Sequence, residues 1–167
     1  MPDPELDRFN TEPAERAEER LRACNAAPSF APRVAAGRPY PDADELVARA
    51  EEVSRALPWE EVAAALAAHP RIGDRVEGTS AEAAASRREQ SAMGTAGDGD
   101  RAAIVGGNRA YEERFDHVFL IRAAGRSAAE MLAELHRRLG NSPDDERAEV
   151  TEQLAQITGL RVRQFVS

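Results

Sequence analysis

The chain has 167 residues, enough to bury a sizeable hydrophobic core in one domain. Its formal net charge of −8 argues against a nucleic-acid or anionic membrane partner, and no basic stripe with interleaved aromatic residues occurs. Aromatic residues make up only 5% of the chain, so the core must be built from small and aliphatic side chains, which favours closely packed helices.

The composition also indicates a cellular compartment and the side chain that can supply positive charge to a ligand. One cysteine, Cys24, excludes an intrachain disulfide, and the N-terminus lacks the basic and apolar regions of a signal peptide, so we expect a cytoplasmic protein. No apolar run approaches the roughly 20 residues that span a bilayer. All 22 basic residues are arginine, so any cationic contact to a ligand must come from a guanidinium, which binds carboxylates and ureas in a fork.

The N-terminal half has the pattern of three helices separated by proline-rich breaks. We expect residues 1–8 to form a loosely ordered segment. Apolar residues at helical spacing then predict helices over 11–25, 42–57 and 59–68, with a loop rich in Pro and Ala at 28–41. Pro70 ends the third helix, because the residue before a proline is pushed out of the helical conformation, so His69 should lie at a helix C-terminus.

The C-terminal half continues the helical pattern. Capping boxes at Thr79 and Ser127 predict helices over 79–93 and 127–139. The helical pattern predicts two more over 101–115 and 142–157, and Gly159 interrupts the pattern after the last of them. The run 117–121 resembles a strand but is short and solitary, so we expect an extended connector whose backbone groups can bond something else. We therefore predict an all-α fold, a single-domain bundle of about seven to nine helices over residues 1–167.

Two polar clusters about twenty residues apart carry the chemistry. They are His69-Pro70-Arg71-Ile72-Gly73 and Ser86-Arg87-Arg88-Glu89-Gln90. An imidazole titrates near neutral pH and can move a proton, although at a helix C-terminus His69 could simply interact with the terminal carbonyls. Glu89 shares a helix face with Ser86, but a helical glutamate is often only solvated. Gln90 alone is uninformative.

The other polar residues allow two interpretations each. Arg161, between Leu160 and Val162, is either a surface arginine that lays its stem on apolar neighbours or a clamp on a planar, carbonyl-rich ligand. Asn108 and Tyr111 share a helix face, for which packing on the core is the simpler explanation.

Nucleophile and metal chemistry are disfavoured. Ser86 lacks the setting of a nucleophilic serine. The three histidines have no metal-ligand spacing, so we expect no metal site.

The combined pattern resembles the OHCU decarboxylase family over about 9–163. It consists of the His69 cluster, Ser86-x-x-Glu89-Gln90, Asn108-x-x-Tyr111-x-x-x-Phe115, Phe119-x-Ile121 and Leu160-Arg161. OHCU is 2-oxo-4-hydroxy-4-carboxy-5-ureidoimidazoline, the last unstable intermediate between urate and allantoin. The resemblance implies an all-α homodimer that needs no cofactor and converts OHCU to (S)-allantoin.

The resemblance also implies residue roles. His69 and Glu89 would form the catalytic pair. The residues implied in substrate binding are Pro70, which would shape the pocket wall, Ser86, Gln90, Arg161 and the main chain of Phe119, Leu120 and Ile121. Two places depart from the family pattern: Gly106-Gly107, where better helix formers are usual, and Asp116-His117, which replaces a glycine followed by an aromatic residue.

Two other functions stay open at this point. The chain could be a helical ureide-binding or interaction module that has kept the pocket and lost turnover. It could also be a helical adaptor without a pocket, which would instead expose apolar faces.

Overall fold

The computed structural model describes residues 3–69, 71 and 98–167. Within these ranges the chain forms eight helices and no strand, which confirms the predicted all-α class. No helix in the described ranges is long and apolar enough to cross a membrane. The helix predicted over 79–93 lies outside the described residues.

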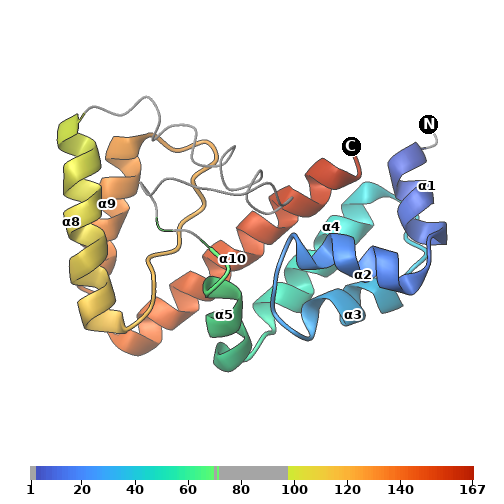
Figure 1. Cartoon of the computed structure of the whole chain (residues 1–167), viewed down its shortest axis with the longest axis horizontal. Helices are drawn as coiled ribbons and strands as arrows, with labels where there is room; N and C mark the ends of the chain where they lie inside the picture. Colours follow the sequence, from blue (N-terminus) through green and yellow to red (C-terminus); the bar gives the residue numbers. More distant parts are fainter. Residues whose placement is uncertain (1–2, 70, 72–97) are drawn as a thin grey trace. The chain divides into compact units, whose positions relative to one another are not determined.

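The chain divides into two compact units, Met1–Ala65 with Leu154–Ser167, and Leu66–Gln153. We describe each unit by itself, and the single-domain organisation stays a prediction. The helices are drawn in Figure 1, with the bounds α1 (Pro4–Thr11), α2 (Ala14–Arg22), α3 (Phe30–Ala36), α4 (Ala43–Arg55), α5 (Trp59–Leu66), α8 (Asp98–Phe115), α9 (Ala128–Arg138) and α10 (Pro143–Phe165).

The N-terminal segment is helical from Pro4, although we expected residues 1–8 to be loosely ordered. Asp3 caps α1, because its carboxylate accepts hydrogen bonds from the backbone N–H groups of Glu5 and Leu6, each at 3.1 Å. The buried ring of Phe9 packs against the ring of Phe165, with centroids 5.6 Å apart. Tertiary packing therefore stabilises a helix too short for its periodicity to reveal.

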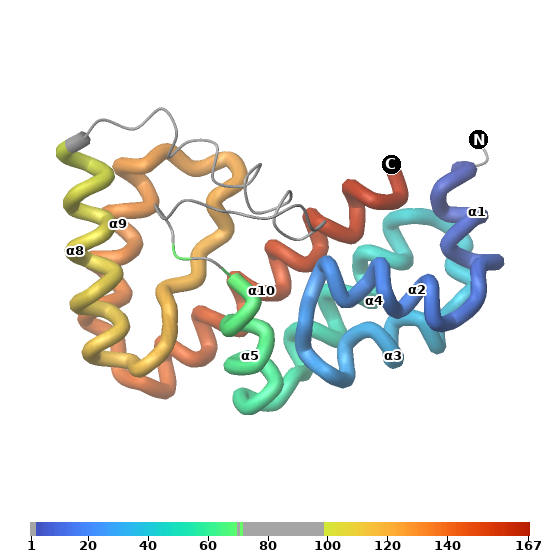
Figure 2. Tube along the Cα trace, in the orientation of Figure 1, coloured from blue at the N-terminus to red at the C-terminus, as the bar shows by residue number. Residues whose placement is uncertain are grey.

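A second short helix, α3, lies inside the predicted loop 28–41. It packs against both α2 and α4, whose traces adjoin it in Figure 2, and it buries Phe30 and Val34 completely. Proline is tolerated in the first turn of a helix, where the backbone N–H has no partner within the helix, so Pro32 does not prevent α3 from forming. The prediction of a loop was wrong because it gave the prolines too much weight.

Two other helices confirm the sequence pattern closely. Asp42 caps α4 by accepting from the backbone N–H of Glu45 at 2.8 Å. Ser127 caps α9 by accepting from the N–H of Glu130 at 3.1 Å, so the predicted helix start there is correct. Helix α10, however, continues through Gly159 to Phe165. The predicted interruption was wrong, since Gly159 leaves room for the Glu51 side chain, which a Cβ would overlap.

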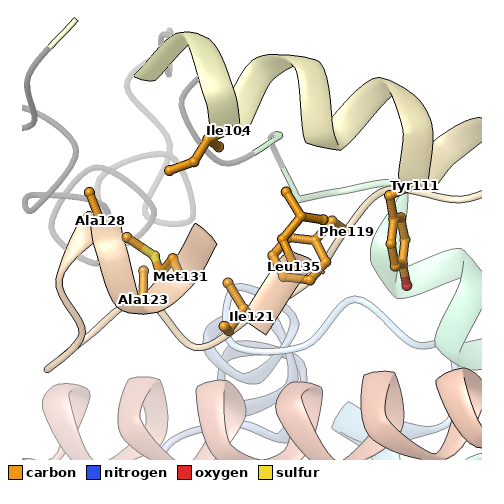
Figure 3. Close-up of a cluster of buried hydrophobic side chains, with 8 residues drawn as sticks. All are labelled: Ile104, Tyr111, Phe119, Ile121, Ala123, Ala128, Met131 and Leu135. Carbon is orange, nitrogen blue, oxygen red and sulfur yellow. The ribbon is translucent and has the colours of Figure 1, made fainter. Parts of the chain in front are cut away.

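The core of the second unit lies between α8, α9 and the connector that joins them. Its eight buried residues, drawn in Figure 3, are Ile104, Tyr111, Phe119, Ile121, Ala123, Ala128, Met131 and Leu135. Helices α8 and α9 run side by side. A Cβ on Gly107 would collide with the buried side chain of Leu135, whereas a Cβ on Gly106 would meet nothing within 4 Å. Gly107 thus permits the close approach of the two helices.

This difference predicts opposite effects for two neighbouring substitutions. Gly106→Ala should raise the free energy of unfolding by up to about 1 kcal/mol, because alanine favours the helix. Gly107→Ala should lower it by about 1–3 kcal/mol, because Leu135 must move within a packed core. Urea denaturation of both variants measures the effect, and equal stabilisation of both would contradict the close approach.

Candidate functional site

His69 lies just beyond the end of α5, as the sequence predicted. Its backbone N–H donates to the carbonyl of Leu66 at 2.9 Å, and the residue is half-buried. Of the two residues proposed as the catalytic pair, His69 alone lies in the described ranges. Glu89, and with it the predicted binding residues Pro70, Ser86 and Gln90, lies outside them.

Arg71, two residues beyond His69, is tied to α8. Its guanidinium forms a two-pronged ion pair with the carboxylate of Glu112, in which Nη2 and Oε2 are 3.1 Å apart. A hollow of about 350 Å³ adjoins this pair and is lined by Arg71, Val105, Asn108, Arg109 and Glu112. Its rim carries two guanidiniums and one carboxylate, an excess of positive charge. His69 is not part of this lining.

The connector between α8 and α9 is buried at its centre and forms neither helix nor strand. Phe119, Leu120 and Ile121 are each 3–4% exposed. Phe119, Ile121 and Ala123 contribute to the same core cluster, and Figure 3 shows the first two within it. Alternate residues on one side are the signature of an extended chain. The side chains of Phe119 and Ile121 are therefore used for packing.

The backbone of the connector is held by side chains. The carbonyl of Leu120 accepts from Nη1 of Arg138 at 2.8 Å, and the N–H of Arg122 donates to Oε1 of Gln153 at 2.8 Å. Within the described part of the chain, residues 118–122 form no backbone-to-backbone hydrogen bond. Buried backbone groups need partners, and here Arg138 on α9 and Gln153 on α10 supply two of them.

Arg138 forms a buried ion pair that the sequence analysis missed. Its Nε lies 2.6 Å and 3.0 Å from the two carboxylate oxygens of Glu146, and the two side chains are 2% and 0% exposed. The guanidinium also lies 4.5 Å from the ring centroid of Phe119. A signal was present: Met131, Leu135 and Arg138 recur at helical spacing, which puts an arginine on an apolar face.

Tyr111 packs beside this ion pair. Its ring meets that of Phe119 edge-on, with centroids 5.2 Å apart, and the residue is fully buried. Burial raises the pKa of Tyr111 far above its ordinary value, and the negative charge of Glu146 raises it further. The phenol therefore stays neutral. The prediction that Tyr111 packs on the core is confirmed.

Arg161 is buried in the first unit. It is 4% exposed, whereas its neighbour Leu160 is 37% exposed. The alternative of a surface arginine lying along apolar neighbours was therefore wrong. A guanidinium withdrawn from water interacts strongly with charged and polar partners, which is what a ligand clamp requires.

Asp116 joins α8 to the connector in a left-handed conformation. Its φ is 61°, and its N–H donates to the carbonyl of Glu112 at 2.9 Å. Side chains with a Cβ pay about 1–2 kcal/mol in this region, although aspartate tolerates it better than most. The position that departs from the family's usual glycine is thus one where glycine fits the backbone best.

Replacement of Asp116 should test this conformation. Asp116→Gly is expected to raise the free energy of unfolding by roughly 0.5 kcal/mol, the relief of strain less the greater chain entropy of glycine. Gly125→Ala, at φ 79° in the same connector, should lower it because it introduces the corresponding strain. Thermal unfolding compares the two, and a loss of stability in Asp116→Gly would contradict the assignment.

Two solved structures of other proteins share this architecture. A solved structure titled as OHCU decarboxylase in the presence of (S)-allantoin superposes with a TM-score of 0.75 at 24% identity, covering 88% of this chain and 96% of that one. A structure titled (S)-allantoin synthase gives 0.70 at 15% identity, covering 96% of this chain and 54% of that one. The chain therefore shares the all-helical fold of these two structures.

Sequence comparison is more specific. A 2-oxo-4-hydroxy-4-carboxy-5-ureidoimidazoline decarboxylase of Amia calva is 33% identical over 141 residues, which cover 83% of this chain and 81% of the relative. The family model described as OHCU decarboxylase matches residues 10–163. The chain belongs to the OHCU decarboxylase family, a family of carboxy-lyases, and the resemblance drawn from its motifs is confirmed.

Proposed function

We propose that the chain removes carbon dioxide from OHCU and yields (S)-allantoin without a cofactor. The observation that carries this proposal is the family match over residues 10–163, because that range contains all the residues to which the motifs assign a role. From the same resemblance we propose a homodimer that acts in the cytoplasm.

The substrate itself explains how a cofactor can be dispensed with. Decarboxylation breaks the bond between the ring carbon and the carboxylate and leaves an electron pair that needs a sink, a role often given to a cofactor. In OHCU an imine adjoins that carbon and accepts the pair. The imine nitrogen that holds the pair takes up a proton, and a second proton reaches the carbon that carries the ureido group as the hydroxyl proton is lost, which gives the carbonyl of allantoin. The protein must orient the carboxylate and deliver one proton to one face.

His69 and Glu89 are the proposed catalytic pair. The imidazole would exchange protons at the 4-hydroxyl and the carboxylate, because histidine is the side chain that most often serves as a general acid or base. Glu89 would orient the imidazole or the substrate, and its charge would crowd the departing carboxylate. The half-buried position of His69 just after α5 supports this role, because the turn fixes the start of its side chain.

Substrate binding would fall to Arg161, Ser86 and the connector. The guanidinium of Arg161 would hold the ureido or ring carbonyls in a fork, and Ser86 would donate a hydrogen bond. Main-chain groups of Phe119–Ile121 would complete the site, with Pro70 and Gln90 at its wall. The burial of Arg161 supports this assignment, since charge-assisted hydrogen bonds are strongest away from water.

The reaction can be followed with OHCU generated in situ from urate. The chain should accelerate the decay of OHCU absorbance and give one enantiomer of allantoin by circular dichroism. His69→Ala and Glu89→Gln should each lose about 10²–10⁴-fold in rate, as expected for loss of an acid–base group. His136→Ala, an exposed histidine on α9, is the control and should keep the rate.

The same experiment separates the other two functions. Tight binding of (S)-allantoin without any acceleration would show a ureide-binding module that lacks turnover. Racemic allantoin at the spontaneous rate, with no binding, would contradict both and favour an adaptor.

Arg161→Lys should test whether the Arg161 guanidinium holds the substrate through two parallel hydrogen bonds. Lysine keeps the charge but cannot make two parallel hydrogen bonds, so KM should rise about tenfold or more, with a smaller effect on kcat. The control is Arg163→Lys, because Arg163 is exposed and pairs with Asp44 at 2.9 Å. Steady-state kinetics measures both variants, and an unchanged KM in a folded Arg161→Lys would contradict the clamp.

A further inference from the structure

The hydrogen bonds of the connector fall on alternate residues. Leu120 bonds Arg138 through its carbonyl, and Arg122 bonds Gln153 through its N–H. In an extended chain the N–H and C=O of one residue point to the same edge, and those of the next residue point to the opposite edge. Arg138 and Gln153 therefore hold one edge of the connector, and the backbone groups of Phe119 and Ile121 belong to the other.

The side chains agree with this geometry. Phe119, Ile121 and Ala123 pack into one cluster, as alternate residues of an extended chain do. Side chains project roughly at right angles to the backbone hydrogen-bonding edges. Packing therefore fixes the rotation of the connector about its axis, and the two side-chain hydrogen bonds fix which edge faces inward.

Arg138 suits this task because its guanidinium serves two acceptors at once. Nε meets the carboxylate of Glu146, while Nη1 donates to the carbonyl of Leu120. Burying such an ion pair costs desolvation energy, and well-packed apolar residues of similar volume would often be as stable or more stable. Its placement is better explained by what it positions than by the stability it adds.

We propose that Arg138 and Gln153 are positioning residues for the decarboxylation. They hold one edge of the connector so that the main-chain N–H and C=O groups of Phe119 and Ile121 on the other edge meet the substrate. A ureido group and a ring amide offer both donors and acceptors, which such an edge can match. The identity of the substrate in this inference rests on the proposed function, whereas the anchoring of the connector by Arg138 and Gln153 does not.

The test uses two variants with matched controls. Gln153→Met removes the acceptor with little change of shape, whereas Gln153→Glu keeps an acceptor oxygen. Arg138→Lys keeps a charge for Glu146 but loses the fork. Its control is Arg137→Lys, the adjacent residue of α9, whose exposed guanidinium pairs with Glu149 on α10.

Three measurements are made on each full-length variant. They are KM and kcat for OHCU, the Kd of (S)-allantoin, and the amide NMR signals of Phe119 and Ile121 without ligand. Gln153→Met and Arg138→Lys should raise KM and the Kd about tenfold, lower kcat less, and shift both amide signals. Gln153→Glu should stay within about twofold of the unaltered chain because it keeps an acceptor oxygen, and Arg137→Lys should do so because Arg137 is exposed and its ion pair adds little.

Unchanged KM, Kd and amide signals in a folded Gln153→Met would overturn the inference, even if Arg138→Lys failed to fold. Lower stability alone, with these readouts unmoved, would assign both residues a purely structural role and overturn it as well. Failure of the proposed function is distinguishable: the unaltered chain would then not accelerate OHCU decay. The amide signals would still decide whether the two side chains hold the edge.

Discussion

The buried ion pair between Arg138 and Glu146 is the constraint around which the second unit is organised. It joins α9 to α10 across fully buried surface, and the same guanidinium reaches the backbone of the connector. Removal of one partner from such a pair leaves an uncompensated charge and costs about 3–5 kcal/mol, so neither residue can change alone without penalty. A single side chain thus couples two helices and a loop.

The connector shows why a helical protein needs such a device. A chain that passes through a core without forming a helix or a sheet must find partners for its backbone groups. Here the partners on one edge are two side chains, Arg138 of α9 and Gln153 of α10. This arrangement gives an extended segment the rigidity of a strand without a sheet, and a rigid main chain is what recognition of a small polar ligand requires.

The sequence predicted features that depend on local chemistry. The cap at Ser127 was found because a cap is a short-range hydrogen bond between near neighbours. Helix α3 was missed because its prolines were given too much weight, whereas the helix is stabilised by packing against α2 and α4 and by the burial of Phe30. Arg138 was missed for a related reason. It bonds Glu146 and Leu120, and only the fold shows that these two residues lie close to it. The roles proposed for His69 and Glu89 came from the family resemblance.

The use of arginine alone as the basic residue connects these observations. A buried lysine can lose its proton, whereas a guanidinium stays charged at any physiological pH and can serve several acceptors in one plane. Arg138 uses that capacity to hold a carboxylate and a carbonyl, and buried Arg161 is suited to use it on a ligand. A guanidinium therefore keeps its charge while it holds such groups, and burial keeps the phenol of Tyr111 neutral near pH 7. If His69 exchanges the proton during decarboxylation, the dependence of the rate on pH near neutrality should report that imidazole and not the groups that hold the substrate.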